Sequence, residues 1–150
     1  MCVFRVVNAG TQYLVLQRAK EETLYPGLWQ IVTGTMKKGE RALSAALREL
    51  KEETGCSPKQ CWTIPYVDSY FDPVKEALQM VPVFAAELDA SSTLHLSEEH
   101  QRCAWMRYDK ARRRVVWPGQ RRSMDIVNEF IIGNKETARL VQIPIERISL

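Results

Sequence analysis

The chain has 150 residues, 45% of them hydrophobic and 26% charged, with a formal net charge of +3 at pH 7. This composition excludes a disordered or fibrous chain, and the length predicts a single domain spanning residues 1–150. The small net charge gives no reason to expect a nucleic-acid partner, and no apolar run is long enough for a membrane span. We therefore expect a cytoplasmic protein with neither nucleic-acid nor membrane partners, and its oligomeric state stays open.

Short β-prone runs open the chain. Residues 3–7 and 13–17 flank a turn signal at residues 8–10, which together predict a hairpin. A further strand is predicted over residues 28–32, after a polar segment that contains turn residues. This strand leads into the helix described next, so Trp29 is expected to lie near that helix.

An amphipathic helix is predicted from about Glu40 to Thr54, with Gly55 and Pro58 ending it. At about 100° per residue, one face of this helix collects small and apolar side chains suited to a core. These residues are Leu43, Ala46, Leu47, Leu50 and Thr54.

The opposite flank of the same helix carries Glu49, Glu52 and Glu53, which are spaced at i, i+3 and i+4. Like charges at this spacing repel, and acidic side chains near the C-terminal end oppose the helix dipole. One interpretation is a solvated face neutralised by Lys51 and by Arg48, which is placed to pair with Glu52. The other is a site for a hard cation such as Mg²⁺ or Mn²⁺. The helix alone does not decide between them.

The spacing of the whole stretch resembles the signature of the Nudix hydrolases. Gly34 is followed after five residues by Glu40 and, after seven more, by the run RELKEETG at residues 48–55. Cys56 stands where that family carries an aliphatic residue, a mild departure because a buried cysteine acts as a small hydrophobe. The resemblance implies an α/β fold, the Nudix-type α/β/α sandwich with a mixed β-sheet between helices.

The resemblance also implies roles for the residues of the signature. Members of the family hydrolyse a nucleoside diphosphate linked to another moiety, using Mg²⁺ or Mn²⁺. Glu49, Glu53 and the Gly34 carbonyl would be metal ligands, and Glu52 would be a further ligand or would hold metal-bound water. Arg48 would orient a signature glutamate, while Glu40 would brace the loop onto the helix.

Two longer strands are predicted after the helix, over residues 61–71 and 77–88, and Pro82 predicts a sheet edge or a bulge in the second. A short strand is predicted over residues 103–107. It is followed by a brief basic helix over 108–115 and by a last main helix over 118–132. The alternating run at residues 140–145 is interpreted as an edge strand or a docking arm.

A narrower resemblance concerns the branch that hydrolyses dihydroneopterin triphosphate and dATP. It is carried by the string Trp29 to Gly34, by Glu99 next to His100, and by Trp105 five residues further on. It implies that Glu99 completes the metal site, although a capping or surface carboxylate is the alternative. The general base stays open among Glu52, Glu53 and Glu99.

Two residues are candidates for contacting the substrate. Arg18, at the end of a predicted strand, either faces phosphates or is solvated surface, and Trp29 either stacks on a flat ring or packs in the core. The expected function is metal-dependent cleavage of a (deoxy)nucleoside or pterin triphosphate to monophosphate and pyrophosphate. The alternatives are hydrolysis of oxidised nucleotides, dinucleoside polyphosphates or ADP-ribose, and a non-catalytic nucleotide-binding module.

Overall fold

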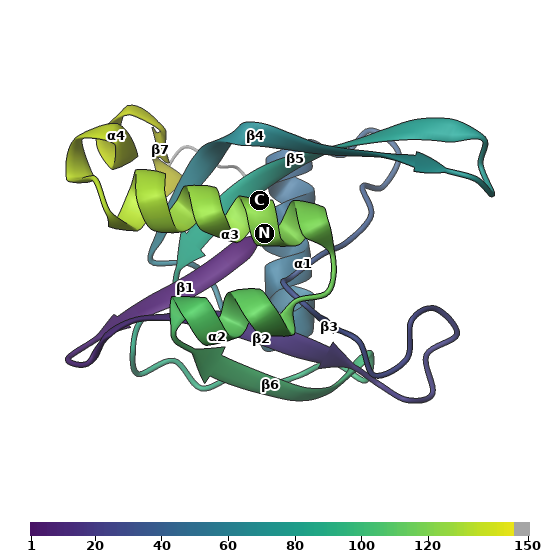
Figure 1. Cartoon of the computed structure of the whole chain (residues 1–150), viewed down its shortest axis with the longest axis horizontal. Helices are drawn as coiled ribbons and strands as arrows, with labels where there is room; N and C mark the ends of the chain where they lie inside the picture. The colour runs from purple at the N-terminus through teal and green to yellow at the C-terminus, as the bar shows by residue number, and fades with distance from the viewer. Residues whose placement is uncertain (146–150) are drawn as a thin grey trace.

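The computed structural model describes residues 1–145, and one mixed sheet forms its centre (Figure 1). Its strands are β1 (Cys2–Val7), β2 (Gly10–Arg18), β3 (Trp29–Gln30), β4 (Gln60–Asp72), β5 (Ala77–Glu87), β6 (His100–Met106) and β7 (Gln142–Ile143). They lie in the order β3-β2-β1-β5-β4-β7, and β6 also pairs with β2. The β1–β5 pair is parallel and the remaining pairs are antiparallel.

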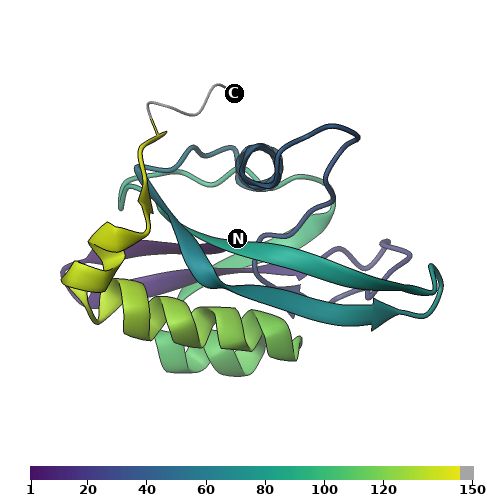
Figure 2. The same cartoon turned by 90° about the horizontal axis from the view of Figure 1, so that it is seen from above.

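Helices cover both faces of this sheet. They are α1 (Ala42–Thr54), α2 (Tyr108–Arg114), α3 (Pro118–Ile126), the π-helical η1 (Val127–Ile132) and α4 (Lys135–Leu140). Figure 2 shows α1 end-on above the sheet, with α2 and α3 beneath it. The predicted α/β/α class with a mixed central sheet is therefore confirmed. None of the helices within residues 1–145 is long and apolar enough to cross a membrane.

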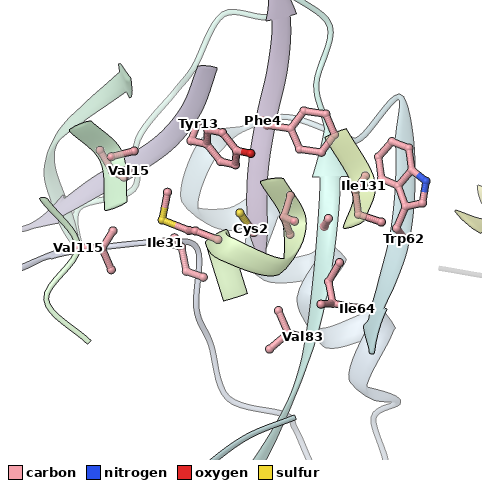
Figure 3. Close-up of a cluster of buried hydrophobic side chains, with 14 of the residues drawn as sticks. Cys2, Phe4, Tyr13, Val15, Ile31, Trp62, Ile64, Val83, Val115 and Ile131 are labelled. Atoms are coloured by element: carbon pink, nitrogen blue, oxygen red, sulfur yellow. The ribbon is translucent and has the colours of Figure 1, made fainter. Parts of the chain in front are cut away.

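Two buried clusters hold the layers together. The larger lies between the sheet and the α2–α3 side, where Phe4 stacks on Trp62 at a centroid distance of 5.6 Å and also contacts Tyr13 (Figure 3). The smaller lies under α1 and includes Leu50, which is fully buried, and Cys56. Cys56 therefore fills the apolar position that the signature assigns to it.

Most predicted elements are present, with shifted ends. The first hairpin and the two long strands are confirmed, but β3 has two residues, where five were predicted. The predicted last helix runs through α3 and continues as η1 to Ile132. Helix α4 was not predicted, although Asn134 accepts hydrogen bonds from the N–H groups of Glu136 and Thr137 as an N-cap does. The predicted edge strand is present as β7, which pairs with β4.

Helix α1 begins at Ala42 instead of the predicted Glu40, and it ends at Gly55 as expected. Gly55 takes a left-handed φ of 72°, and its N–H donates to the Lys51 carbonyl at 2.9 Å. The predicted orientation of the helix was partly wrong. Glu53 is buried instead of lying on the outer flank with Glu49 and Glu52. The helix is rotated so that one carboxylate enters the protein.

The β4–β5 hairpin extends well beyond the rest of the molecule (Figures 1 and 2). Its register shifts between Thr63 and Val67, and Val67 lies opposite Pro82. The prediction that Pro82 marks a bulge or a free edge is therefore confirmed, because both features occur at this point.

Candidate active site

Arg48 joins the loop before α1 to the helix itself. Its guanidinium donates from Nε and Nη2 to the Glu40 carboxylate at 2.9 and 3.0 Å, and from Nη2 to the Thr35 carbonyl at 3.1 Å. The Glu40 carboxylate also accepts the N–H of Lys37 at 2.8 Å. These hydrogen bonds, chiefly that from Arg48, hold the pKa of Glu40 at about 2. Glu40 therefore closes the loop as an ionised side chain in front of the helix.

The same guanidinium reaches two glutamates of α1. Its Nη1 donates to Glu49 Oε1 at 2.8 Å and to Glu52 Oε2 at 2.8 Å, and the second contact is the predicted i, i+4 pair. Glu49 is mostly shielded from solvent, whereas the Glu52 side chain is 53% exposed. Arg48 thus offsets the repulsion between these two carboxylates, which is part of what the solvated-face interpretation required.

Gly34 and Glu49 lie in unusually close contact. A Cβ atom built at Gly34 would lie 2.0 Å from the carboxyl carbon of Glu49, far inside van der Waals contact. Any other residue at position 34 would displace the carboxylate or the loop. The glycine therefore allows the loop backbone to pass directly over Glu49.

Glu53 is the buried member of the cluster. Its side chain is 4% exposed, and its Oε2 atom has no hydrogen-bond partner. Burial raises the pKa of Glu53 to about 8, and the nearby carboxylates Glu49 and Glu99 add to this rise. The Met1 ammonium and the Thr33 N–H oppose it. An anion in this position lacks its full set of partners, which costs stability.

Glu99 reaches this region from the turn that precedes β6. Its backbone carbonyl accepts the N–H of Ala19 at 2.8 Å, which fixes the turn against the end of β2. The Glu99 side chain is exposed, yet it lies near enough to raise the pKa of Glu53. The structure therefore brings together Glu49, Glu53 and Glu99 from distant parts of the chain.

The donor chemistry of this cluster fits a hard divalent cation. Glu49, Glu53 and Glu99 supply carboxylate oxygens, one of them buried without a partner, beside the loop at Gly34. No three His, Cys, Asp or Glu side chains within residues 1–145 already form a closed metal-binding group. Arg48 contacts one oxygen of Glu49 and one of Glu52, so it positions these carboxylates and leaves the second oxygen of each for a cation.

Arg18 and Trp29, the two candidate substrate contacts, have other partners. Arg18 Nη2 donates to Glu22 Oε2 at 2.5 Å, and its Nε donates to the Leu24 carbonyl at 2.8 Å. Trp29 packs against the larger core cluster on the α2–α3 side, with the Arg114 guanidinium 4.9 Å from its ring centroid. Trp29 therefore packs on the face of the sheet opposite α1, and not beside that helix as was expected.

Several groups around the cluster were not predicted from the sequence. The backbone groups of Thr33 and Thr35 contact Glu53 and Arg48, and backbone groups leave no side-chain signal in a sequence. His100 is buried with its Nε2 3.5 Å from Gln30 Nε2, and burial lowers its pKa to about 4, which keeps the ring neutral. Its position next to Glu99 in the sequence was the available signal.

The structure thus holds an acidic helix behind a glycine loop, set against a mixed sheet between helical layers. A family model described as the NUDIX domain matches residues 1–125. The chain belongs to the Nudix family and is a Nudix hydrolase. The family resemblance seen in residues 34–55 is thereby confirmed.

Relatives and solved structures agree with this assignment. The chain is 29% identical over 109 residues to the nucleoside triphosphatase NudI of Escherichia coli K12, covering 68% of this chain and 77% of NudI. An Ap4A hydrolase from C. elegans superposes with a TM-score of 0.72 at 23% identity, covering 89% of this chain and 95% of that one. The E. coli dihydroneopterin triphosphate pyrophosphohydrolase gives 0.70 at 20% identity, covering 85% and 93%. The two structural matches establish the shared fold.

Proposed function

We propose that the chain is a divalent-cation-dependent pyrophosphohydrolase of a (deoxy)nucleoside or pterin triphosphate, with Mg²⁺ or Mn²⁺ as the cofactor. The observation that carries this proposal is the buried, unpaired Oε2 of Glu53, flanked by the carboxylates of Glu49 and Glu99. A carboxylate oxygen without a partner inside a protein is costly unless a ligand uses it. The similarity to NudI, a nucleoside triphosphatase, supports a triphosphate as the substrate.

Glu49, Glu53, Glu99 and the Gly34 carbonyl would hold the cation. When bound, a divalent cation neutralises phosphate charge and polarises the phosphorus that is attacked. Arg48 positions Glu49 and ties it to the loop through Glu40. The glutamates and the Gly34 carbonyl would supply oxygens to the cation, and the cation would offset the repulsion between these carboxylates and the phosphate chain.

Glu52 is our candidate for receiving the proton of the attacking water. It is the signature carboxylate whose side chain is largely open to solvent, and Arg48 fixes one of its oxygens. The water oxygen forms the new bond to phosphorus while the bridge between the α- and β-phosphates breaks. The proton passes to Glu52, the pyrophosphate leaves, and the nucleoside or pterin monophosphate remains.

Arg18 and Trp29 stay proposals as substrate contacts. The Arg18 guanidinium lies at the end of β2, close to the turn that carries Glu99, but it must exchange Glu22 for a phosphate. Trp29 would meet a ring only from the α2–α3 side, after Arg114 moves from its face. Because both residues would have to leave their present partners, mutation tests their roles more directly than the geometry does.

The test is a substrate panel with Mg²⁺ and identified products. It would include dATP, the other deoxynucleoside triphosphates, dihydroneopterin triphosphate, oxidised nucleotides, dinucleoside polyphosphates and ADP-ribose. We expect pyrophosphate from at least one triphosphate and a loss of about 10²-fold or more in kcat/KM for Glu53→Gln. Glu129→Gln, an exposed change on η1, is the control and should keep full activity.

Two results would contradict the proposal. If the panel yields no pyrophosphate from any triphosphate, the substrate class is wrong. If Glu53→Gln retains metal-dependent hydrolysis undiminished, the site assignment is wrong. Tight nucleotide binding without turnover in the wild type would instead support the non-catalytic binding module.

A further inference from the structure

The projecting part of the β4–β5 hairpin has two free edges. Within residues 1–145, β5 pairs with β1 only at Ala85–Glu87, and β4 pairs with β7 only at Cys61–Trp62. Beyond those residues the two strands pair only with each other, out to Asp72 opposite Ala77. Figures 1 and 2 show the outer part of this hairpin standing clear of the helices, and both of its edges are free.

One face of this hairpin is entirely uncharged. Successive side chains of a strand point to opposite faces, and residues directly opposite one another share a face. The pairs Val67–Pro82, Ser69–Met80 and Phe71–Leu78 therefore form a continuous surface, which we call the apolar stripe. Four of its side chains are strongly exposed: Phe71 62%, Leu78 67%, Met80 67% and Val67 44%.

The other face of the hairpin turns towards α3 and carries the acidic Asp68 and Asp72 beside the exposed Tyr70 and Val81. Asp68 lies on it, with its carboxylate so close to Gly119 that a Cβ there would be 2.0 Å away. Tyr66 donates to the same carboxylate at 3.3 Å. The apolar stripe consequently lies on the α1 side of the sheet, the side that carries the carboxylate cluster.

The charges and prolines of the hairpin limit which kinds of molecule could bind to the apolar stripe. Residues 63–84 contain three acidic side chains and a single lysine, which disfavours anionic lipid and nucleic acid. Pro65 and Pro82 lack the N–H that edge-to-edge pairing needs, so the free edges are poor templates for another strand. The apolar stripe, in contrast, carries no charged side chain that would oppose contact with another molecule. Its exposed area is on the order of 400 Å², a size that often marks an interaction site.

We propose that the apolar stripe is the contact surface of a symmetric dimer with a second copy of this chain. A two-fold contact requires a self-complementary patch. The small Ser69 lies at the centre of the stripe beside the large Met80, with bulky pairs at both ends. A two-fold axis that runs along the strands through this centre sets Met80 of each copy over Ser69 of the other. The same axis sets Phe71 over Leu78 and Val67 over Pro82.

The stripe keeps acidic groups out of this contact, because Asp68 and Asp72 occupy the opposite face of the hairpin. Its area is about half of the ~800 Å² that each partner buries in a standard interface, so the dimer is a weak one. Association should therefore depend on protein concentration in the micromolar range or above. The partner hairpin would lie on the same side of the sheet as the carboxylate cluster.

Sedimentation velocity of the full chain tests this proposal, at loading concentrations from about 10 to about 500 µM. The wild type should shift from monomer towards dimer as concentration rises. Met80→Lys places a charge at the centre of the stripe and should remain monomeric throughout. Tyr70→Lys is the matched control, because Tyr70 is 53% exposed on the opposite face of the same hairpin. It should dimerise like the wild type.

Both variants alter exposed positions, and circular dichroism would verify that each remains folded. A wild type that stays monomeric over the whole range overturns the proposal. So does equal loss of dimer in both lysine variants, which would point to general charge repulsion. A monomeric wild type that instead binds neutral phospholipid vesicles through Met80 would assign the stripe to lipid.

Discussion

Gly34 leaves room for the Glu49 carboxylate: a Cβ at position 34 would lie 2.0 Å from its carboxyl carbon. Gly34→Ala should therefore push Glu49 out of place and lower kcat/KM by at least about 10-fold. Gly119→Ala is a matched control, because its new Cβ meets the Asp68 carboxylate at the same 2.0 Å, outside the proposed site. It should cost stability with little loss of turnover. Equal losses of activity in the two variants would contradict a specific role for Gly34.

Arg48 is expected to affect cation binding indirectly, by positioning the carboxylates of Glu40, Glu49 and Glu52. Arg48→Lys keeps the charge but loses the planar fork that binds Glu40 with two N–H groups while contacting Glu49 and Glu52. We expect Mn²⁺ affinity, measured by titration calorimetry, to fall about 10- to 100-fold. Arg41→Lys, at the exposed residue before α1, should leave the affinity unchanged. Unaltered Mn²⁺ binding in Arg48→Lys would remove Arg48 from the site.

Glu53→Gln should have opposite effects in the absence and presence of cation. Without cation, it removes a buried carboxylate with an unpaired oxygen and supplies an amide that can donate to neighbouring acidic groups. The free energy of unfolding should rise by about 1–3 kcal/mol. With Mg²⁺, the wild type should gain stability by mass action, and the variant should gain much less.

Thermal unfolding in EDTA and in excess Mg²⁺ measures both effects for Glu53→Gln. A purely structural role for Glu53 predicts the reverse, namely a variant less stable than the wild type in EDTA. Equal stabilisation of both proteins by Mg²⁺ would place the cation elsewhere.

Glu99 and Glu98 provide a comparison within one exposed turn. Both side chains are exposed, but Glu99 is the one that raises the pKa of Glu53. Glu99→Gln should weaken Mn²⁺ binding about 10-fold or more, and Glu98→Gln should not. Electron paramagnetic resonance of bound Mn²⁺ provides the measurement. Identical affinities in the two variants would return Glu99 to the surface-carboxylate interpretation.

The ion pair between Arg112 and Asp125 should make stability depend on pH. Hydrogen bonding from Arg112 lowers the pKa of Asp125, so its contribution is present above the ordinary carboxyl pKa and is lost as pH falls through the lowered value. Asp125→Asn should cost about 0.5 kcal/mol at pH 7, since the pair is partly exposed, and less at about pH 3, below the ordinary carboxyl pKa. Urea unfolding at both pH values measures this difference. Asp109→Asn, in a more exposed pair, should have no measurable effect at either pH.

The contacts among the signature residues could be predicted from the sequence because these residues lie close together along the chain. Arg48 meets Glu52 one helical turn away and reaches Glu40 across a short loop, so fixed spacing determines these neighbours. The burial of Glu53 could not be predicted, because the Met1 ammonium and the Thr33 N–H that lie near it come from distant parts of the chain. Periodicity places a residue on a helix face, but distant segments decide how that face is turned.

The orientation of Trp29 shows the same limit in a strand. Two residues of β3 alternate between the faces of the sheet, and Trp29 takes the α2–α3 side while Gln30 contacts His100. A strand of two residues is too short for its sequence pattern to show which side chain faces α1 and which faces α2 and α3. The proximity of Glu99 to α1 likewise arises from the pairing of β6 with β2, which joins residues about 85 positions apart.

The parallel pairing of β1 with β5 has a consequence for folding during synthesis of the chain. Cys2 lies opposite Ala85, so more than half of the chain is synthesised before β5, the parallel neighbour of β1, exists. Helix α1 and its acidic residues are synthesised during that interval, ahead of the strands that complete the sheet. Closing so large a loop is slow, and the apolar first hairpin remains uncovered meanwhile. Folding during translation should therefore be a late event, in which α1 packs in its final position only after β5 has been synthesised.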